Sequence, residues 1–98
     1  MVLEAVVLNV RHGQEEAFEA AMGRARPLIE ATPGFISMSM RRCVETRNRY
    51  LLLVSWETLE DHTVGFRQSE RYLQWRDLLH HFYDPFPVVE HYVDLGAD

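Results

Sequence analysis

The chain has 98 residues, 47% of them hydrophobic, which fits one folded domain and excludes intrinsic disorder. Its 10 Lys and Arg against 15 Asp and Glu give a net charge of −5, which argues against non-specific nucleic-acid binding because that binding needs a cationic surface. No apolar run reaches membrane-spanning length, the N-terminus has the pattern of a strand and not of a signal peptide, and the lone Cys43 cannot form an internal disulfide. We therefore expect a single cytoplasmic domain over residues 1–98.

The N-terminal third predicts a strand followed by a helix. Residues 2–10 are rich in β-branched and aliphatic side chains, which is typical of a strand, and His12-Gly13 ends it. From Gln14 the apolar residues take helical spacing. One helix face carries Phe18, Ala21, Met22, Ala25, Leu28 and Ile29. Pro27 within this pattern predicts a kink or an early end, and Thr32-Pro33-Gly34 predicts a turn.

Two further strands are predicted in the middle of the chain, over residues 35–44 and 49–56, joined by a polar hairpin at 45–48. In the first of them, Ile36, Met38 and Met40 alternate with Ser37 and Ser39. In the second, Leu51 and Leu53 point to one face, and Tyr50, Leu52, Val54 and Trp56 to the other. Because both faces are apolar, we expect one to be covered by the chain's own helices and the other by a second copy in a homodimer.

The C-terminal third predicts a split helix and a last strand. A short helix is expected over residues 59–66, and Ser69 is expected to cap a second one. Its apolar face carries Tyr72, Trp75, Leu78, Leu79 and Phe82. Residues 88–95 have the composition of a strand. The resulting β-α-β-β-α-β order predicts a ferredoxin-like α+β fold, with an antiparallel sheet and both helices on one face.

Three residues are candidates for chemistry. His62 could act as a general base, since the ordinary pKa of histidine suits neutral pH. Trp56 offers an indole N–H, which needs a partner when buried. Arg76 shares a helical row with Tyr72 and His80 and could lean into a pocket between helix and sheet. The plainer interpretations are an exposed loop histidine, a core tryptophan and a solvated arginine whose stem packs on the core.

Cofactor motifs are missing from the sequence: there is no dinucleotide-binding glycine motif, no P-loop, no nucleophile elbow and no zinc-protease motif. The five histidines do not show the short, fixed spacings that zinc sites favour. We therefore predict neither a metal nor a bound cofactor.

The order of several features resembles the antibiotic-biosynthesis monooxygenase (ABM) domain. They are the Pro33-Gly34-Phe35 turn, the strand ending in Trp56-Glu57 with an acidic helix start after it, Ser69 opening a helix with Tyr72, and the terminal Val89-Glu90-His91-Tyr92 strand. The resemblance covers almost the whole chain. It implies a homodimeric α+β barrel in which each protomer keeps a pocket between its sheet and its helices. Family activities include cofactor-free oxidation of polycyclic phenols, quinol oxidation and haem degradation.

Carried over residue by residue, the resemblance is partial. The polyketide-oxidising branch uses an Asn, a Trp and an Arg, whose positions here are Leu52, Trp56 and Arg76, and His62 falls near a family Tyr. The haem-degrading branch uses an Asn, a Trp and a His. Their positions here are Val6, Gly65 or Phe66, and Arg76, so that activity is disfavoured.

These observations lead to one functional hypothesis and one alternative. The hypothesis is a cofactor-independent monooxygenase or quinol oxidase that acts on an aromatic phenol or hydroquinone with O₂, with His62 as base and Trp56 and Arg76 as donors. The side chains expected to line its substrate pocket are Met38, Leu52, Phe66, Tyr72 and His80. The alternative is a non-catalytic dimeric domain that binds a small ligand or serves in a stress response.

Overall fold

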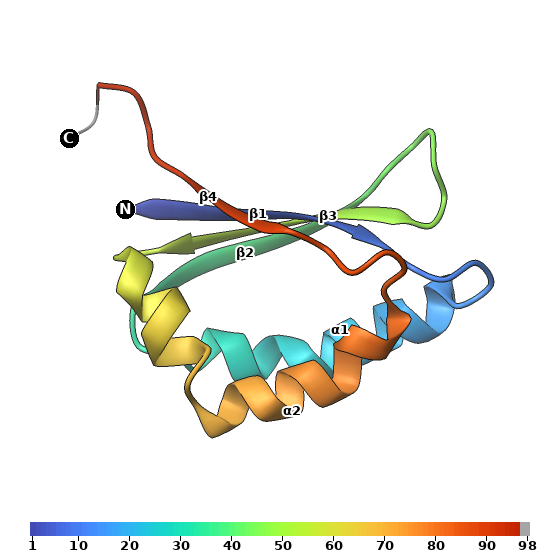
Figure 1. The fold of residues 1–98 in the computed structure, drawn as a ribbon, viewed down its shortest axis with the longest axis horizontal. Coiled ribbons are helices and arrows are strands. Elements are labelled where there is room, and N and C mark those ends of the chain that lie inside the picture. The colour runs from blue at the N-terminus through green and yellow to red at the C-terminus, as the bar shows by residue number, and fades with distance from the viewer. Residues whose placement is uncertain (97–98) are drawn as a thin grey trace.

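The computed structural model describes residues 1–96 and confirms the predicted ferredoxin-like α+β fold (Figure 1). The elements are β1 (Val2–Asn9), α1 (Glu15–Glu30), β2 (Phe35–Arg42), β3 (Arg49–Trp56), the π-helix η1 (Asp61–Phe66), α2 (Glu70–Leu79), the 3₁₀ turn η2 (His80–Phe82) and β4 (Val89–Tyr92). The strands form one antiparallel sheet in the order β2-β3-β1-β4, and α1 and α2 lie together under one face of it. No helix within the described residues is long and apolar enough to cross a membrane.

Helix α1 continues through Pro27, so the predicted early end was wrong. Proline removes only its own N–H from the helix, and the carbonyl of Pro27 still accepts a hydrogen bond from the N–H of Ala31 at 3.1 Å. Ala25 and Ile29, on either side of Pro27, are buried against the rest of the core. This packing holds the last turn of the helix in place.

The predicted alternation of β2 was wrong at its start. The register shifts between Phe35 and Ser37, which places Phe35 opposite Trp56 at the edge of the core. The two rings meet edge to face at 6.0 Å, and Ile36 is left 45% exposed. An extra residue in one strand of a pair is a β-bulge, which reverses the side-chain phase on one side of it. The strand also ends at Arg42, two residues earlier than expected, and β4 ends at Tyr92 and not at residue 95.

The inner face of the sheet and the two helices enclose the core. Alternate residues of the two central strands, β1 and β3, point inward and are almost fully buried. They are Glu4, Val6 and Leu8 on β1, and Tyr50, Leu52, Val54 and Trp56 on β3. Burying a large apolar side chain contributes about 1.5–3 kcal/mol. Glu4 is a buried carboxylate in the middle of this apolar set.

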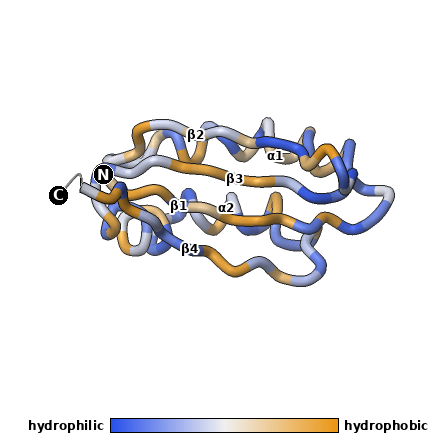
Figure 2. The backbone as a smooth tube through the Cα atoms, turned by 90° about the horizontal axis from the view of Figure 1, so that it is seen from above, coloured by the Kyte–Doolittle hydropathy of each residue, from blue (hydrophilic) through white to orange (hydrophobic). Residues whose placement is uncertain are grey.

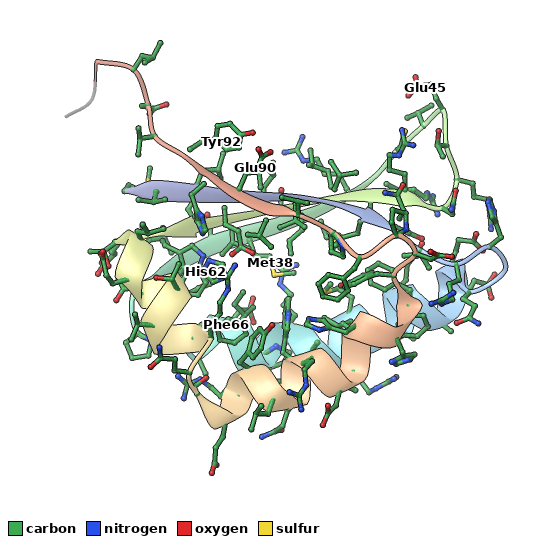
Figure 3. All side chains as sticks on the ribbon, in the orientation of Figure 1. Met38, Glu45, His62, Phe66, Glu90 and Tyr92 are labelled. Atoms are coloured by element: carbon green, nitrogen blue, oxygen red, sulfur yellow. The ribbon has the colours of Figure 1, made fainter. Side chains whose placement is uncertain are left out.

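The outer face of the sheet carries apolar side chains with no helix over them. Figure 2 shows hydrophobic segments along β1 and β3, and Figure 3 shows Glu90 and Tyr92 on the side of the sheet away from the helices. Val7 is 48% exposed, and Leu3 and Leu51 are each 36% exposed. We name this surface, with Leu53 and Tyr92, the outer sheet face.

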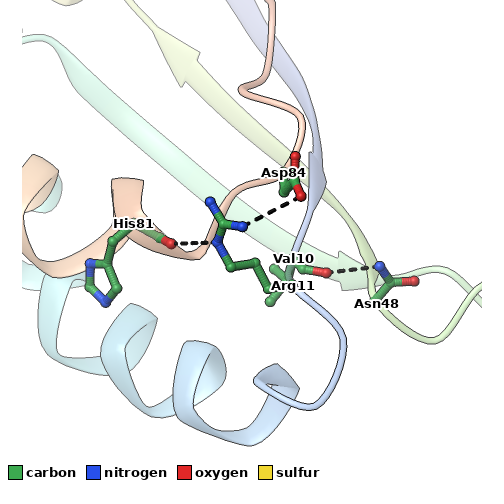
Figure 4. A network of polar contacts seen from close by, with 5 residues as sticks. All are labelled: Val10, Arg11, Asn48, His81 and Asp84. Atoms are coloured by element: carbon green, nitrogen blue, oxygen red, sulfur yellow. Dashed lines mark hydrogen bonds and ion pairs between the residues drawn. The ribbon is translucent and has the colours of Figure 1, made fainter.

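A polar network fixes the segment that follows α2 against the end of β1 (Figure 4). Arg11 Nε donates to the carbonyl of His81 at 3.1 Å, and Arg11 Nη1 lies 3.4 Å from a carboxylate oxygen of Asp84. Close by, Asn48 donates to the carbonyl of Val10 at 2.8 Å, and Val10 pairs with Tyr83 in an isolated β-bridge. These contacts fix the position of residues 81–84 relative to the end of β1.

Candidate active site

A cavity of about 390 Å³ lies between the inner face of the sheet and α2. This volume falls in the range of small-molecule sites, which is roughly 300–1,000 Å³. Its walls come from β1, α1, β3, η1 and the turn after it, α2, η2 and the segment after it, and β4. They are formed by Glu4, Val6, Leu8, Ile29, Leu52, His62, Phe66, Arg67, Tyr72, Trp75, His80, Tyr83, Phe86, Pro87 and Val89. We call this space the sheet–helix cavity.

Aromatic rings dominate the helix side of the sheet–helix cavity. Phe66 contacts Tyr72 and Trp75 edge to face, with ring centroids 5.5 and 5.6 Å apart. Further along the wall, the His80 ring meets Phe86 edge to face at 5.1 Å. Edge-to-face contacts stabilise ring packing and fix ring orientation. The wall therefore offers a rigid aromatic surface on which a flat ring system could pack.

A buried carboxylate forms the polar end of the sheet–helix cavity. Glu4 is 4% exposed, and its Oε1 accepts a hydrogen bond from the Trp56 indole at 3.0 Å. Burial raises the pKa of the Glu4 carboxyl above its ordinary value, while the Trp56 hydrogen bond and the charge of Arg67 act in the opposite direction. A carboxylate with a raised pKa is a stronger base than an ordinary glutamate.

His62 joins Glu4 to a second histidine. Its Nε2 lies 3.4 Å from Glu4 Oε1, and its Nδ1 lies 2.8 Å from Nε2 of His91. The imidazole stacks on the Trp56 ring at 5.2 Å and is only 3% exposed. Burial, with the charges of Arg67 and His91, lowers the pKa of His62 from 6.5 to about 3, so the ring is neutral at physiological pH. We call Glu4, Trp56, His62 and His91 the polar cluster.

The local sequence explains why His62 points inward. Thr58 and Asp61 cap the start of the helix reciprocally: each backbone N–H donates to the other residue's side chain at 3.1 Å. The following turn is a π-helix, in which the N–H of Arg67 donates to the carbonyl of His62. His62 and Phe66 therefore share the buried side of η1 (Figure 3). Single π-helical turns are rare and are found disproportionately at functional sites.

The structure brings together most of the side chains predicted from the sequence. Leu52, His62, Phe66, Tyr72 and His80 all line the sheet–helix cavity. Trp56 is fully buried behind Glu4 and reaches the site through its hydrogen bond. Met38 is buried in the core and is not part of the cavity wall.

The predicted inward orientation of Arg76 was wrong. Its side chain is 49% exposed, and its guanidinium lies 3.4 Å from the carboxylate of the neighbouring Asp77. Arg76 starts from the edge of the apolar face of α2, and its long side chain continues outward into solvent. The arginine that does line the cavity is Arg67, in the turn between η1 and α2.

Sequence reasoning missed three residues of the site: Glu4, Arg67 and His91. The phase of β1 was a usable signal for Glu4, because Glu4, Val6 and Leu8 are two residues apart and share a strand face. His91 lies directly opposite Glu4 in the β1–β4 pairing, so its position depends on the strand register. Arg67 lies in a turn, where neither strand nor helix periodicity indicates the direction of a side chain.

The possible metal ligands of the polar cluster, Glu4, His62 and His91, do not surround a common point. The two ring nitrogens of His62 face opposite neighbours, Glu4 on one side and His91 on the other, whereas metal ligands surround a shared centre. Among residues 1–96, no group of three His, Cys, Asp or Glu side chains is arranged to hold a metal ion. The cluster is instead a line of hydrogen-bonding groups that starts at the cavity wall.

Comparisons with known proteins match this architecture. The uncharacterized protein YczJ of Bacillus subtilis (strain 168) is 52% identical over 95 residues, which cover 97% of this chain and all of that protein. A crystal structure from Bordetella bronchiseptica, described as a "Putative antibiotic biosynthesis monooxygenase", superposes with a TM-score of 0.90 at 35% identity and covers 96% of both chains.

A more distant structure shares the fold. SnoaB from Streptomyces nogalater, described as a cofactor-independent oxygenase, superposes with a TM-score of 0.84 at 17% identity and covers 98% of this chain and 94% of its own. The family model "Antibiotic biosynthesis monooxygenase" matches residues 1–78, a range that includes Glu4, Trp56 and His62. The chain therefore belongs to the antibiotic biosynthesis monooxygenase (ABM) family.

Proposed function

We propose that this protein is a cofactor-independent monooxygenase or quinol oxidase that acts on an aromatic phenol or hydroquinone with O₂. The observation that carries the proposal is the polar cluster at the end of an aromatic cavity, in a member of the ABM family. We expect a flat ring system to pack on the aromatic wall of the cavity, with the cluster supplying a base beside it. The likeness to SnoaB, described as a cofactor-independent oxygenase, supports chemistry without a bound cofactor.

The chemistry needs little from the protein because the substrate supplies the electrons. Loss of the phenolic proton gives an electron-rich anion that can reduce O₂. A hydroquinone that gives two electrons and two protons to O₂ yields a quinone and hydrogen peroxide, which balances without another oxidant. The protein then has three tasks: to accept the proton, to stabilise the anion, and to keep the site dry.

Each task has a candidate residue in the structure. The buried Glu4–His62 pair accepts the proton, with Glu4 as the stronger base because the pKa of His62 is lowered to about 3. Trp56 holds Glu4 in position through its indole N–H. Arg67 replaces Arg76 as the cation that stabilises the developing anion, since Arg67 lines the cavity. Aromatic side chains of η1 and α2 would shield the bound substrate from water.

Oxygen consumption tests the proposal directly. Protein freed of flavin, haem and metal ions is given a panel of hydroquinones and anthrone-like phenols, and O₂ uptake is followed with an electrode. We expect Glu4→Gln to lower the rate about 10²-fold, the contribution typical of a positioned general base. His12→Gln, at an exposed position outside the cavity lining, is the control and should match the wild type. Uptake no faster than that of Glu4→Gln on every substrate would contradict the proposal.

One observation favours the alternative of a non-catalytic binding domain. Leu52 lines the cavity where the resemblance expects a polar Asn, so one polar contact is lost. Trp56 and Phe66 do not fill the space, however, and a cavity of about 390 Å³ remains beside them. Saturable binding of a hydroquinone without O₂ uptake would support the binding domain.

We also propose that two copies associate through the outer sheet face. Its apolar residues on β1 and β3 are exposed in one chain, and the helices cover only the opposite face (Figure 1). A hollow lined by Leu3, Val7, Leu51 and Leu53 lies on this face. An interface that covers a whole sheet face should bury more than roughly 1,200 Å² in total.

A further inference from the structure

The polar cluster extends beyond the cavity wall toward the surface of the protein. Glu4 and His62 are 4% and 3% exposed, whereas His91 on β4 is only partly buried. Their contacts run in sequence, from Glu4 Oε1 to His62 Nε2 at 3.4 Å and from His62 Nδ1 to His91 Nε2 at 2.8 Å. Glu4 and His91 are also direct partners in the β1–β4 pairing, which fixes their spacing.

This arrangement has the properties of a proton path. Each histidine can accept a proton on one ring nitrogen and release one from the other, and His62 uses both nitrogens for two different partners. A histidine that served only to orient Glu4 would need one contact. The second contact leads away from the cavity to a ring that reaches solvent.

We infer that His91 is a proton-transfer residue that connects Glu4, through His62, with solvent. The inference rests on the proposed function, because it concerns the proton that the substrate loses there. His91 would be a relay group and not a catalytic residue, since it does not line the sheet–helix cavity.

The transfer balances without any further reagent. The substrate O–H bond breaks and its proton forms an O–H bond on Glu4. That proton then moves to His62 Nε2 while the proton on His62 Nδ1 moves to His91 Nε2. His91, now an imidazolium, releases a proton to water from its own Nδ1. The net result is one proton moved from the substrate to solvent, with Glu4 again ionised and both imidazoles in the other tautomer, from which they return before the next transfer.

The groups around His91 favour release of its extra proton to solvent. The groups that face the path are Glu4 from β1, the neutral Trp56 indole from β3, and Arg67 from the turn after η1. Burial first, and then the charge of Arg67, lowers the pKa of His91 below its ordinary value. An imidazolium that forms at His91 therefore loses its proton readily at neutral pH.

Two variants test the relay. His91→Gln keeps a hydrogen-bonding side chain next to His62 but cannot pass a proton, and His91→Phe removes both properties. We expect each variant to lower kcat at least tenfold in dilute, bulky buffer and to leave KM nearly unchanged. Free imidazole at tens of millimolar should restore part of the rate, because a mobile base can replace the lost ring. His12→Gln, at an exposed position, is the control and should show no buffer dependence.

A structural readout separates failure of the relay from failure of the proposed function. Nitrogen-15 NMR of the imidazoles reports which ring nitrogen of His62 carries its proton. We expect titration of His91 to shift the His62 signals, and we expect His91→Phe to abolish this coupling. Wild-type O₂ uptake with unchanged kcat in His91→Gln would overturn the relay and leave the proposed function standing. Absence of the NMR coupling would overturn it even if no substrate is found.

Discussion

The Trp56 indole and the Glu4 carboxylate meet at 3.0 Å between adjacent strands, and both side chains are sealed from solvent. A buried carboxylate is costly unless its oxygens find donors, and the indole supplies one. The same bond fixes the position of Glu4 beside His62. Trp56 therefore closes the core and also positions the proposed base, Glu4, whereas the sequence indicated the indole N–H as a donor to the substrate anion.

Replacing Trp56 by Phe separates these roles, because the ring remains and the N–H is lost. We expect a loss of about 1–3 kcal/mol in the free energy of unfolding, since a buried acceptor loses its partner. The hydrogen bond lowers the pKa of Glu4, so its loss should raise that pKa and move the acid limb of activity to higher pH. Tyr50→Phe, which removes a hydrogen bond to Glu19 outside the cavity lining, is the control. An unchanged pH profile in Trp56→Phe would contradict the assigned orientation of Glu4.

His62 should make the protein less stable as the pH falls. Its folded-state pKa, about 3, lies below the value of 6.5 for an exposed histidine. Its contribution is therefore fully present above pH 6.5 and is lost as the pH falls toward 3. Glu4, with a raised pKa, acts in the opposite sense: its contribution is present below pH 4.5 and is lost as the pH rises through the folded value.

Replacing Glu4 by Gln removes the glutamate's contribution to the pH dependence of the unfolding free energy, so that in this background the contribution of His62 can be measured alone. Adding His62→Gln to that background should flatten the decline in unfolding free energy between pH 6.5 and 4, measured by urea denaturation. Adding His12→Gln, at an exposed position, should leave the slope as it is. Equal slopes with and without His62 would show that the ring is not held neutral.

Arg67 and Arg76 form a matched pair for the anion-stabilising role. Arg67 lines the cavity, whereas Arg76 is exposed beside Asp77. We expect Arg67→Gln to lower kcat/KM for a phenolic substrate by about 10²-fold, by analogy with the loss of one donor to a developing oxyanion. Arg76→Gln should stay within a factor of two of the wild type. A large loss of kcat/KM in Arg76→Gln, with little change in Arg67→Gln, would support Arg76 as the donor, as predicted from the sequence.

Gly34 should be far less tolerant than Gly23. Gly34 has a φ of +89°, and a Cβ at this position would overlap the carboxylate of Asp61, which caps the helix that carries His62. We expect Gly34→Ala to cost at least about 1–2 kcal/mol in unfolding free energy. Gly23 lies in α1 with open space around it, so Gly23→Ala should stabilise the protein by about 0.5–1 kcal/mol. Urea titration of both variants gives the comparison.

The outer sheet face should control association. Leu53→Asp would place a charge in a dry interface, which costs several kcal/mol and should dissociate the proposed dimer. Val44→Asp, at a position that is 94% exposed on the hairpin, should leave the mass unchanged. Light scattering over a range of concentrations measures both. A wild-type protein that is a stable monomer at micromolar concentration would rule out this dimer.

Much of the fold could be predicted because periodicity reports which side of an element is buried. The alternation of β3 correctly identified Leu52 and Trp56 as inward residues, and Ser69 was correctly identified as a helix cap that accepts from the N–H of Tyr72. The bulge at Ile36 was not predictable from the same pattern, since apolar residues occupy both phases at that point. Strand periodicity carries no information about where a bulge inserts one residue.

The site was harder to predict because it depends on contacts between distant segments. His62 was found through its place after a strand end, but its partners Glu4 and His91 come from opposite ends of the chain. Arg76 was assigned from its helical row, yet a long side chain at the border of two faces can point either way. Burial also lowers the pKa of His62 below the ordinary value assumed from the sequence, which makes His62 a weaker base than expected.

Strand β1 serves two surfaces at once. Its even-numbered residues Glu4 and Val6 line the cavity, and its odd-numbered residues Leu3 and Val7 lie on the outer sheet face. A one-residue slip of this strand would exchange the two sets. If two copies hold that register by covering the outer sheet face, their separation should loosen the strand that carries Glu4, the proposed base. Specific activity would then fall on dilution, near the protein concentration at which the copies come apart.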